Sequence, residues 1–228
     1  MPADAAPVPG TLQLPEEEAV VLEVNGKGVA TLMCTPRDLD VLALGHLLTS
    51  GVISSLDDVL DLVIGPDNER VSVRCSPDPA AGMGSARPAR LLPRGGTFPL
   101  ASIGGWAREM FDRAAIRKET GGMHSAALAD RGGLRCVYED VGRHNAVDKA
   151  IGRGLVDGVD FSRCCLISSG RIAAEMAGKA VAAGIPVFAS RSIPTTAAYG
   201  MAVEKGLTMI GRCSSPSPVV YTMRERVT

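Results

Sequence analysis

The chain has 228 residues, 46% of them hydrophobic and 21% charged, and its formal net charge is −1 at pH 7. This length and balance are typical of a globular protein with a sizeable core, and they exclude disordered and fibrous chains. Lysines and arginines are scattered along the sequence, so no broad basic surface for nucleic acid or anionic lipid is expected. No apolar run approaches the roughly 18 residues of a membrane-spanning helix, and the first residues lack a secretory signal, which predicts a cytoplasmic protein without nucleic-acid or membrane partners.

Six cysteines are spread along the chain: Cys34, Cys75, Cys136, Cys164, Cys165 and Cys213. None belongs to a Cys-x-x-Cys pair, and the adjacent Cys164 and Cys165 would make a strained disulfide. The sequence therefore predicts reduced thiols, most of them inert within apolar runs.

The first residues, 1–18, contain four prolines and an acidic triplet, which predicts a mobile tail. The β-rich runs 20–26 and 28–34 follow, and Asn25-Gly26 between them is typical of a β-hairpin turn. The chain is therefore expected to begin its folded part with two antiparallel strands.

A helix is predicted after Thr35-Pro36, with His46 packed on it as a core or flanking side chain. A second helix over residues 56–62 and a strand over residues 70–75 complete a small first half. The next stretch, 76–96, is rich in proline and glycine and has no period. A loop of this length is either functional or the joint between two subdomains.

Residues 101–119 predict an amphipathic helix, and from residue 120 onward short apolar runs alternate with helical patterns. Strands are predicted over residues 124–129, 134–138, 164–168, 186–190, 207–211 and 218–222. Helices are predicted over residues 143–153, 171–183 and 195–205. This alternation is typical of an α/β sheet with helices on both faces, parallel over residues 164–211.

Ligands of parallel sheets gather beyond the carboxyl ends of the strands, where loops meet helix N-termini. Here the three loops are residues 168–175, 189–195 and 211–218, and all are rich in serine, glycine or arginine. Hydroxyls, backbone N–H groups and the side chains of Arg171 and Arg191 could converge there on an anion such as a phosphate. The alternative is ordinary helix capping by Ser168, Ser169, Ser192 and Thr195.

The segment EDVGRHNAVDKAIG, residues 139–152, gathers many reactive side chains at a predicted helix start. Helical steps of about 100° place His144, Asn145, Asp148 and Lys149 on one face and apolar residues on the other. The polar face meets either water or a pocket. His, Asn and Asp are poorer helix formers than the residues of an ordinary solvated face, which favours the pocket.

A second cluster, TGGMHSAAL over residues 120–128, offers Gly121 and Gly122 for close backbone approach and His124 at a strand edge. Together with His144 it predicts two histidines flanking one cleft. A catalytic zinc site of the deaminase type is excluded, because that chemistry needs a Cys-x-x-Cys and a carboxylate two residues after the histidine. No metal site is expected.

These two segments, with SSGRIAAEMAGKAVAAGIPV, the terminal GLTMIGRC and VVYT, and the opening VLEVNGKGVATLMCTPRDLDVLALGHLLTSGVI, resemble the FdhD/NarQ family of formate dehydrogenase accessory proteins. The resemblance runs from about residue 18 to residue 222, and EDVGRHNA is its most specific part. It implies an α/β, cytidine-deaminase-like layered sheet with helices on both faces, over residues 97–228. A smaller β-rich N-terminal subdomain with the long loop, residues 19–96, precedes it.

The resemblance also implies a function. The family takes persulfide sulfur from a cysteine desulfurase and passes it to the molybdenum cofactor, in its bis-molybdopterin guanine dinucleotide form, before that cofactor is inserted into formate dehydrogenase. A homodimer is implied, and GDP or GMP is expected to mimic the cofactor. The predicted anion site fits the diphosphate of this ligand. The expected cofactor-binding residues are Gly121, Gly122, His124, Asp140, Arg143, His144, Asn145, Asp148, Lys149, Ser169, Gly170, Arg171, Arg212, Cys213, Ser214, Ser215, Pro216 and Ser217.

One departure from the family concerns the sulfur carrier itself. The family places a Cys-x-x-Cys in the long loop, where this chain has Ala80 and Met83. Cys75 at the base of the loop is then the candidate catalytic thiol, with Cys213 as a second choice. Two hypotheses follow: a sulfur carrier that uses Cys75, or a cofactor-binding chaperone that lacks the sulfur-transfer step.

Overall fold

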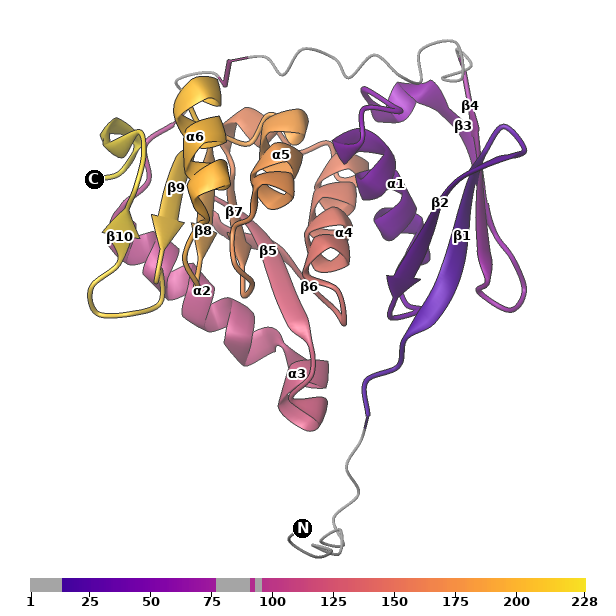
Figure 1. Ribbon diagram of the computed structural model, residues 1–228, viewed down its shortest axis with the longest axis horizontal. Helices are drawn as coiled ribbons and strands as arrows, with labels where there is room; N and C mark the ends of the chain where they lie inside the picture. The colour runs from indigo at the N-terminus through magenta and orange to yellow at the C-terminus, as the bar shows by residue number, and fades with distance from the viewer. Residues whose placement is uncertain (1–13, 77–90, 93–95) are drawn as a thin grey trace, which may run out of the picture.

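The computed structural model describes residues 14–76, 91–92 and 96–228, and it contains two β-sheets with helices between and beside them (Figure 1). Most of the predicted mobile tail lies outside the described residues. Ala80 and Met83, which the resemblance predicts to replace a cysteine pair, lie outside them as well.

The smaller sheet is formed by β1 (Glu18–Val24), β2 (Lys27–Cys34), β3 (Val59–Ile64) and β4 (Arg70–Cys75) in the order β2-β1-β4-β3. The predicted hairpin is confirmed: β1 and β2 are antiparallel, and Asn25 and Gly26 between them have φ angles of 49° and 77°. Helix α1 (Leu39–Thr49) contributes its apolar side chains to the same core as this sheet.

The helix predicted over residues 56–62 is wrong. A single 3₁₀ turn, Leu56–Asp58, is followed by β3, which pairs antiparallel with β4. The Asp58 carboxylate accepts hydrogen bonds from the backbone N–H groups of Ser54 (2.6 Å) and Ser55 (3.2 Å), which fixes this turn. A short apolar run such as VLDLVI has no decisive period, so its pairing partner selects the strand.

The larger sheet has the strand order β10-β9-β8-β7-β5-β6. Its strands are β5 (His124–Asp130), β6 (Gly133–Asp140), β7 (Cys165–Ser168), β8 (Val187–Ser190), β9 (Thr208–Gly211) and β10 (Val219–Val220). Strands β7, β8 and β9 are parallel, as predicted, whereas β5 runs antiparallel to both β6 and β7. Consequently β6, β7, β8 and β9 all end at one edge, where β5 begins.

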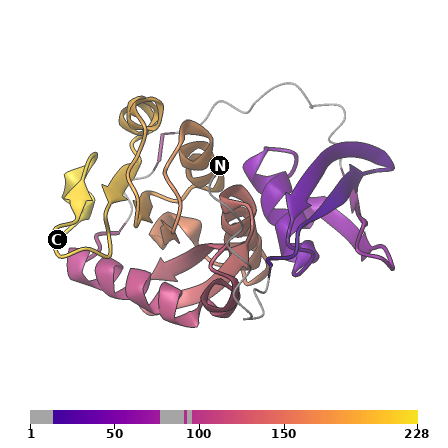
Figure 2. The same cartoon turned by 60° about the horizontal axis from the view of Figure 1, so that its bottom comes forward.

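Helices cover both faces of this sheet (Figure 2). One face packs on α2 (Leu100–Arg113), and the other on α4 (Arg143–Val156), α5 (Ala174–Ala183) and α6 (Thr196–Lys205). Neighbouring strand residues point to opposite sides, because Ile167 belongs to the α2 core and Leu166 to the core beneath α4, α5 and α6. The predicted layered α/β class with a β-rich N-terminal subdomain is confirmed.

The single helix predicted over residues 101–119 is divided at Ala114, where α3 (Ala115–Thr120) begins. The Glu139 carboxylate of β6 accepts hydrogen bonds from the backbone N–H groups of Ile116 at 2.9 Å and Arg117 at 2.7 Å. These bonds satisfy the first donors of a new helix, so a tertiary contact stabilises a break that the local pattern does not predict.

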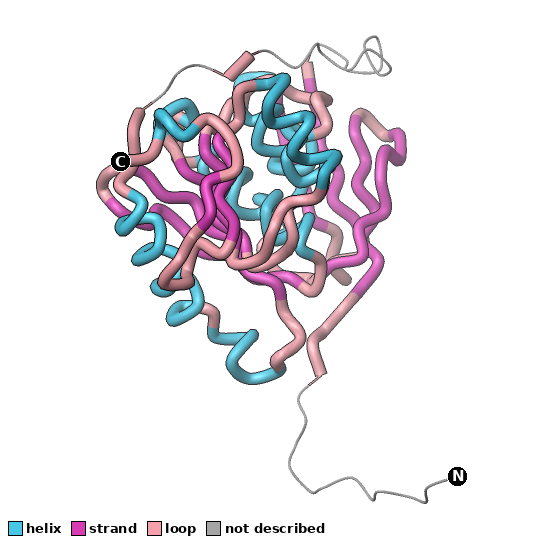
Figure 3. Tube along the Cα trace, turned by 60° about the vertical axis from the view of Figure 1, so that its left-hand side comes forward, coloured by secondary structure: helices cyan, strands magenta, loops and turns pink. Residues whose placement is uncertain are grey.

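Helix α1 joins the two parts of the molecule, because it lies between the small sheet and α4 (Figure 1). Figure 3 shows helices between the two groups of strands. A Cβ atom on Gly45 would lie 1.9 Å from the Asp148 carbonyl oxygen, and one on Gly152 would lie 1.9 Å from that of Val41. Only glycine permits so close an approach of two helices. One continuous core therefore extends from the small sheet to the larger one.

Across the described ranges, every helix is too short or too polar to cross a membrane.

Candidate functional site

The carboxyl ends of the parallel strands share one edge of the large sheet, which is the lower edge in Figure 1. His124 at the start of β5 lies opposite Asp140 at the end of β6, and Ser168 and Ser190 end two neighbouring parallel strands. The loops that follow β7, β8 and β9 are hydrogen-bonded to one another through their backbones. For example, the Cys213 N–H donates to the Ser190 carbonyl at 2.9 Å.

Serines at this edge hold the loop after β7 in shape. The Ser169 hydroxyl oxygen accepts from the Ser125 N–H at 2.9 Å and lies 3.2 Å from Nδ1 of His124. The Ser168 hydroxyl accepts from the Gly170 N–H at 3.2 Å, and Ser190 donates to the Gly170 carbonyl at 2.5 Å. These hydroxyls therefore shape the loop rather than cap a helix.

The capping alternative holds for α6 and not for α5. Thr195 caps α6, because its hydroxyl accepts from the Ala198 N–H at 3.3 Å. The residues before α4 and α5 are Gly142 and Ala173, and neither helix start has a side-chain cap among the described residues. Two helix N-termini at this edge thus present backbone donors and a positive dipole end.

Arg143, the first residue of α4, is a half-buried cation at the same edge. Its Nε atom is buried without a hydrogen-bond partner, and its guanidinium makes no ion pair within the part of the chain that the structure describes. It packs on Gly170, where a Cβ atom would lie 3.0 Å from the Arg143 Cδ atom. An anion would supply the partner that this guanidinium lacks.

The two predicted histidines flank Arg143. Burial lowers the pKa of His124, and the charges of Arg143 and Arg117 lower it further. Burial also lowers the pKa of His144, with Arg143 and Lys179 adding to the shift. Both imidazoles are therefore neutral at pH 7, and each retains one N–H that can donate to a phosphate oxygen.

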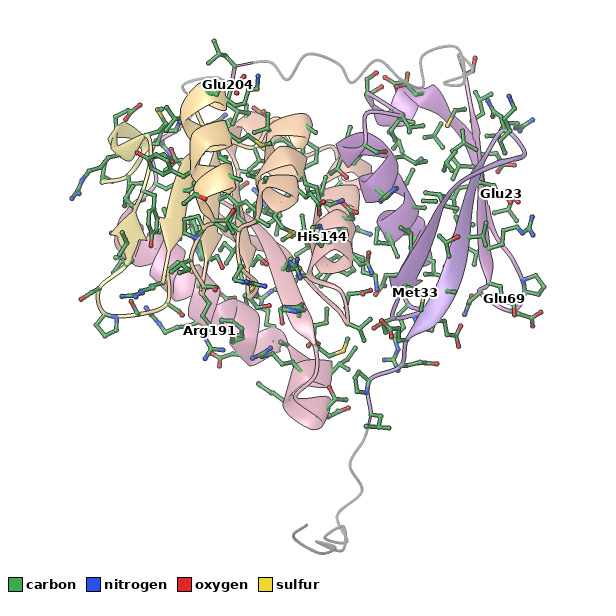
Figure 4. The ribbon with its side chains drawn as sticks, viewed as in Figure 1. Glu23, Met33, Glu69, His144, Arg191 and Glu204 are labelled. Atoms are coloured by element: carbon green, nitrogen blue, oxygen red, sulfur yellow. The ribbon has the colours of Figure 1, made fainter. Side chains whose placement is uncertain are left out.

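More exposed cations surround this edge. The side chains of Arg171, Arg191 and Arg212 are exposed. Arg191 lies at the lower edge of the sheet in Figure 4, and its guanidinium carbon is 5.4 Å from the centroid of the Phe111 ring. Gly121 adopts a left-handed φ of 71° at the end of α3, and the predicted residue Gly122 follows it. Loop residues Ser214 and Ser215 are half-buried, whereas Pro216 and Ser217 are exposed and Cys213 is buried.

A pocket of about 470 Å³ lies beside this edge, between α1, α4 and α5. Its walls include His144 and Asp148, which the sequence predicts, and Thr49, Lys179 and Glu175, which it does not. His46 also lines the pocket, with Nδ1 3.3 Å from an Asp148 oxygen, whereas the sequence favours a packing role for this residue. Residues of α1 line the pocket only because the tertiary fold brings α1 next to α4 and α5, so no local sequence pattern predicts their role.

Lys149 and Asp140 do not face the pocket. Both side chains have 0% exposure, and the Lys149 Nζ atom lies 2.8 Å from an Asp140 oxygen. Asn145 does line the pocket, although it is largely buried, and it donates to the Met33 carbonyl at 2.6 Å and to Asp140 at 3.0 Å. The prediction that Lys149 faces a cleft is corrected, because the small sheet and the Thr35 turn cover this side of α4.

The cysteines do not offer an exposed thiol at the edge. Burial raises the pKa of Cys34, Cys164 and Cys213 to about 12 and that of Cys136 to about 11, and it raises that of Cys165 well above 9.0. Cys75 ends β4 with 6% of its surface exposed. In the described ranges no three His, Cys, Asp or Glu side chains gather as a metal site.

Comparison with known proteins places the chain in a family. The sequence profile of the FdhD/NarQ family matches residues 15–87 and 81–228. A sulfur carrier protein FdhD from Streptomyces avermitilis is 35% identical, with 92% of this chain and 87% of that protein covered. The same-named protein of Methanothermobacter thermautotrophicus is 32% identical over 91% of this chain and 88% of its own length.

A solved structure agrees with these relatives. The crystal structure of a protein named as a formate dehydrogenase accessory protein, from Desulfotalea psychrophila, superposes with a TM-score of 0.81 at 26% identity. The superposition covers 94% of this chain and 90% of that protein, so both subdomains are included. Profile, relatives and architecture agree over nearly the whole sequence: the chain belongs to the FdhD/NarQ family.

Proposed function

We propose that this protein is an accessory protein of formate dehydrogenase that binds the guanine-dinucleotide form of the molybdenum cofactor at the carboxyl edge of its large sheet. The observation that carries this proposal is Arg143, a half-buried guanidinium without an anionic partner in the described part of the chain. The names of the relatives, sulfur carrier and formate dehydrogenase accessory protein, support the accessory role.

The residues at the edge fit a diphosphate. Arg143 supplies a charge-assisted donor, and the starts of α4 and α5 supply uncapped N–H groups and dipole ends. His124 and His144 supply neutral N–H donors. The bound cofactor would supply the metal centre that receives sulfur, while these residues bind and orient its phosphates.

The sulfur-transfer step is a separate question, because a persulfide carrier needs an accessible thiolate. Five thiols have a raised pKa, and Cys75, which pairs with Val59 of β3, is only 6% exposed. This burial favours the cofactor-binding chaperone. The relatives' names favour the second candidate, a sulfur carrier that receives persulfide from a cysteine desulfurase on Cys75 and works as a homodimer.

Isothermal titration of GDP and GMP into the purified protein tests the binding role. Arg143→Met keeps the apolar stem and removes the charge, so we expect GDP binding to weaken at least about tenfold. Arg153→Met is the matched control, because Arg153 lies on the same helix in an exposed pair with Asp157 and should leave GDP affinity unchanged. Absence of GDP binding by the wild-type protein, or equal affinity of Arg143→Met, would refute the proposal.

Intact-mass spectrometry after incubation with a cysteine desulfurase and cysteine tests the transfer role. The chaperone hypothesis expects no added sulfur in a protein that binds GDP. A reducible persulfide that peptide mapping places on Cys75, and that Cys75→Ala abolishes together with formate dehydrogenase maturation, would establish the sulfur carrier instead.

A further inference from the structure

Asp148 connects three helices at the side of the proposed ligand edge. Its carboxylate is 1% exposed and accepts from Lys179 of α5 at 2.6 and 2.8 Å. From α1 it accepts the Thr49 hydroxyl at 2.9 Å, and Nδ1 of His46 lies 3.3 Å away. A buried carboxylate with donors from two other helices fixes the positions of all three.

The backbone at Asp148 is held as closely as its side chain. The Asp148 carbonyl lies against Gly45 of α1, where a Cβ atom would be 1.9 Å away. Because neither helix can slide here without a backbone overlap, α1 meets α4 in one register. The N-terminal subdomain therefore contacts α4 one turn after His144 and little more than one turn after Arg143.

The same groups form the wall of the pocket. His144, Asp148, Lys179 and Thr49 all line the 470 Å³ space, and Glu175 of α5 lies with its carboxylate 3.6 Å from Nε2 of His144. Figure 4 shows His144 between the α4 and α5 ribbons. A shift of α5 relative to α4 would move the two uncapped helix starts apart, so the contacts at Asp148 determine their spacing.

We propose that Asp148 and Thr49 are positioning residues for the ligand site: through the bond between them, the N-terminal subdomain holds α4 and α5 in the arrangement that an anionic ligand requires. The inference rests on the proposed function, because the ligand is the diphosphate bound at Arg143. It assigns the N-terminal subdomain a part in binding, although the phosphate-binding groups belong to the larger subdomain.

Thr49→Val tests the bond with little change of shape, because valine is nearly isosteric with threonine and lacks the hydroxyl. We expect GDP affinity, measured by isothermal titration on folded protein, to fall about three- to tenfold in Thr49→Val. Thr49→Ser keeps the hydroxyl and should bind GDP as the wild type does. Asp157→Asn is the matched control on α4, since it removes an exposed carboxylate at the far end of the helix.

Asp148→Asn should weaken GDP binding further, since Lys179 then loses its anionic partner. A Thr49→Val protein with a lower melting temperature and wild-type GDP affinity would overturn the inference, and so would a Thr49→Ser protein as weak as Thr49→Val. Absence of GDP binding by the wild type would overturn the proposed function as well.

Discussion

Asp140 at the end of β6 and Lys149 in α4 form a buried ion pair. The two Asp140 oxygens also accept from the backbone N–H groups of Thr35 (3.2 Å) and Gly142 (2.9 Å), and Lys149 donates to the Thr35 carbonyl at 3.1 Å. Each charge thus has several partners, which a buried pair needs to offset its desolvation. At the residue scale, two of the most polar side chains in the family signature connect the subdomains.

Lys149→Met is expected to lower the free energy of unfolding by about 3–5 kcal/mol, because it leaves the Asp140 carboxylate buried without its cation. Urea unfolding followed by circular dichroism measures this loss. Arg153→Met, which breaks an exposed pair on the same helix, should cost less than about 1 kcal/mol. Equal costs of the two variants would show that the buried pair does not form.

The histidines give the free energy of unfolding a defined pH dependence. The folded-state pKa values of His124 and His144 lie below the ordinary 6.5, so the unfolded chain binds more protons as the pH falls through that value. Stability should therefore decrease from about pH 7.5 to about pH 5.5, a window in which carboxylates stay ionised. In the double variant His124→Gln, His144→Gln, the free energy of unfolding measured by urea titration should change less between these two pH values. An unchanged dependence of the unfolding free energy on pH would contradict the lowered pKa values.

At the scale of elements, the contact between α1 and α4 decides how the two sheets are joined. Gly45 and Gly152 lie where each helix meets the backbone of the other. Glycine stabilises a helix by about 1 kcal/mol less than alanine does. In α1 and α4 this loss of helix stability is offset by the close packing of the two helices that glycine permits.

Gly152→Ala is expected to destabilise the protein by about 1–3 kcal/mol in spite of alanine's better helix propensity, because its methyl group would overlap the Val41 carbonyl. Gly105→Ala in α2 is the control, since a Cβ atom there meets nothing within 4 Å. That change should raise the free energy of unfolding by about 0.5–1 kcal/mol. Thermal unfolding distinguishes the two, and a Gly152→Ala protein as stable as the wild type would argue against the helix contact.

At the scale of the whole molecule, burial in the core raises the pKa values of the cysteine thiols. A thiol with a pKa of about 12, as for Cys34, Cys164 and Cys213, carries roughly a thousandfold less thiolate near pH 8 than one at 9.0. Thiolate is the form that attacks electrophiles and persulfides. The reactivity of these thiols is therefore governed by their packing in the core.

Iodoacetamide near pH 8 should alkylate these three thiols very slowly in the native protein and rapidly in denaturing urea, as followed by peptide mass spectrometry. Cys136, with a pKa of about 11 and partial exposure, should be slow as well. Rapid native modification of any of the four would show that the core opens readily at that site.

The sequence alone determined the features that local rules control. Asn25-Gly26 specified the first hairpin, and the alternation of strands and helices over residues 164–211 specified a parallel sheet, because turn residues and periodicity act over a few positions. Motifs such as EDVGRHNA were specific enough to identify the FdhD/NarQ family from the residues by themselves. Arg143, His124 and His144 were also predicted from the sequence as residues of one site, and the structure places them at the same edge.

Only the tertiary structure decided where partners from distant segments meet. Residues 59–64 became a strand because β4 pairs with them, and the helix break at Ala114 follows from bonds to Glu139. Helical periodicity placed Lys149 and Asp148 on one polar face of α4. In the folded molecule α1 and the small sheet bury this face, so Lys149 pairs with Asp140 and Asp148 pairs with Lys179. Asp148 meets Thr49 across 99 residues of sequence, and no local pattern encodes a contact whose free energy comes from burial in the folded molecule.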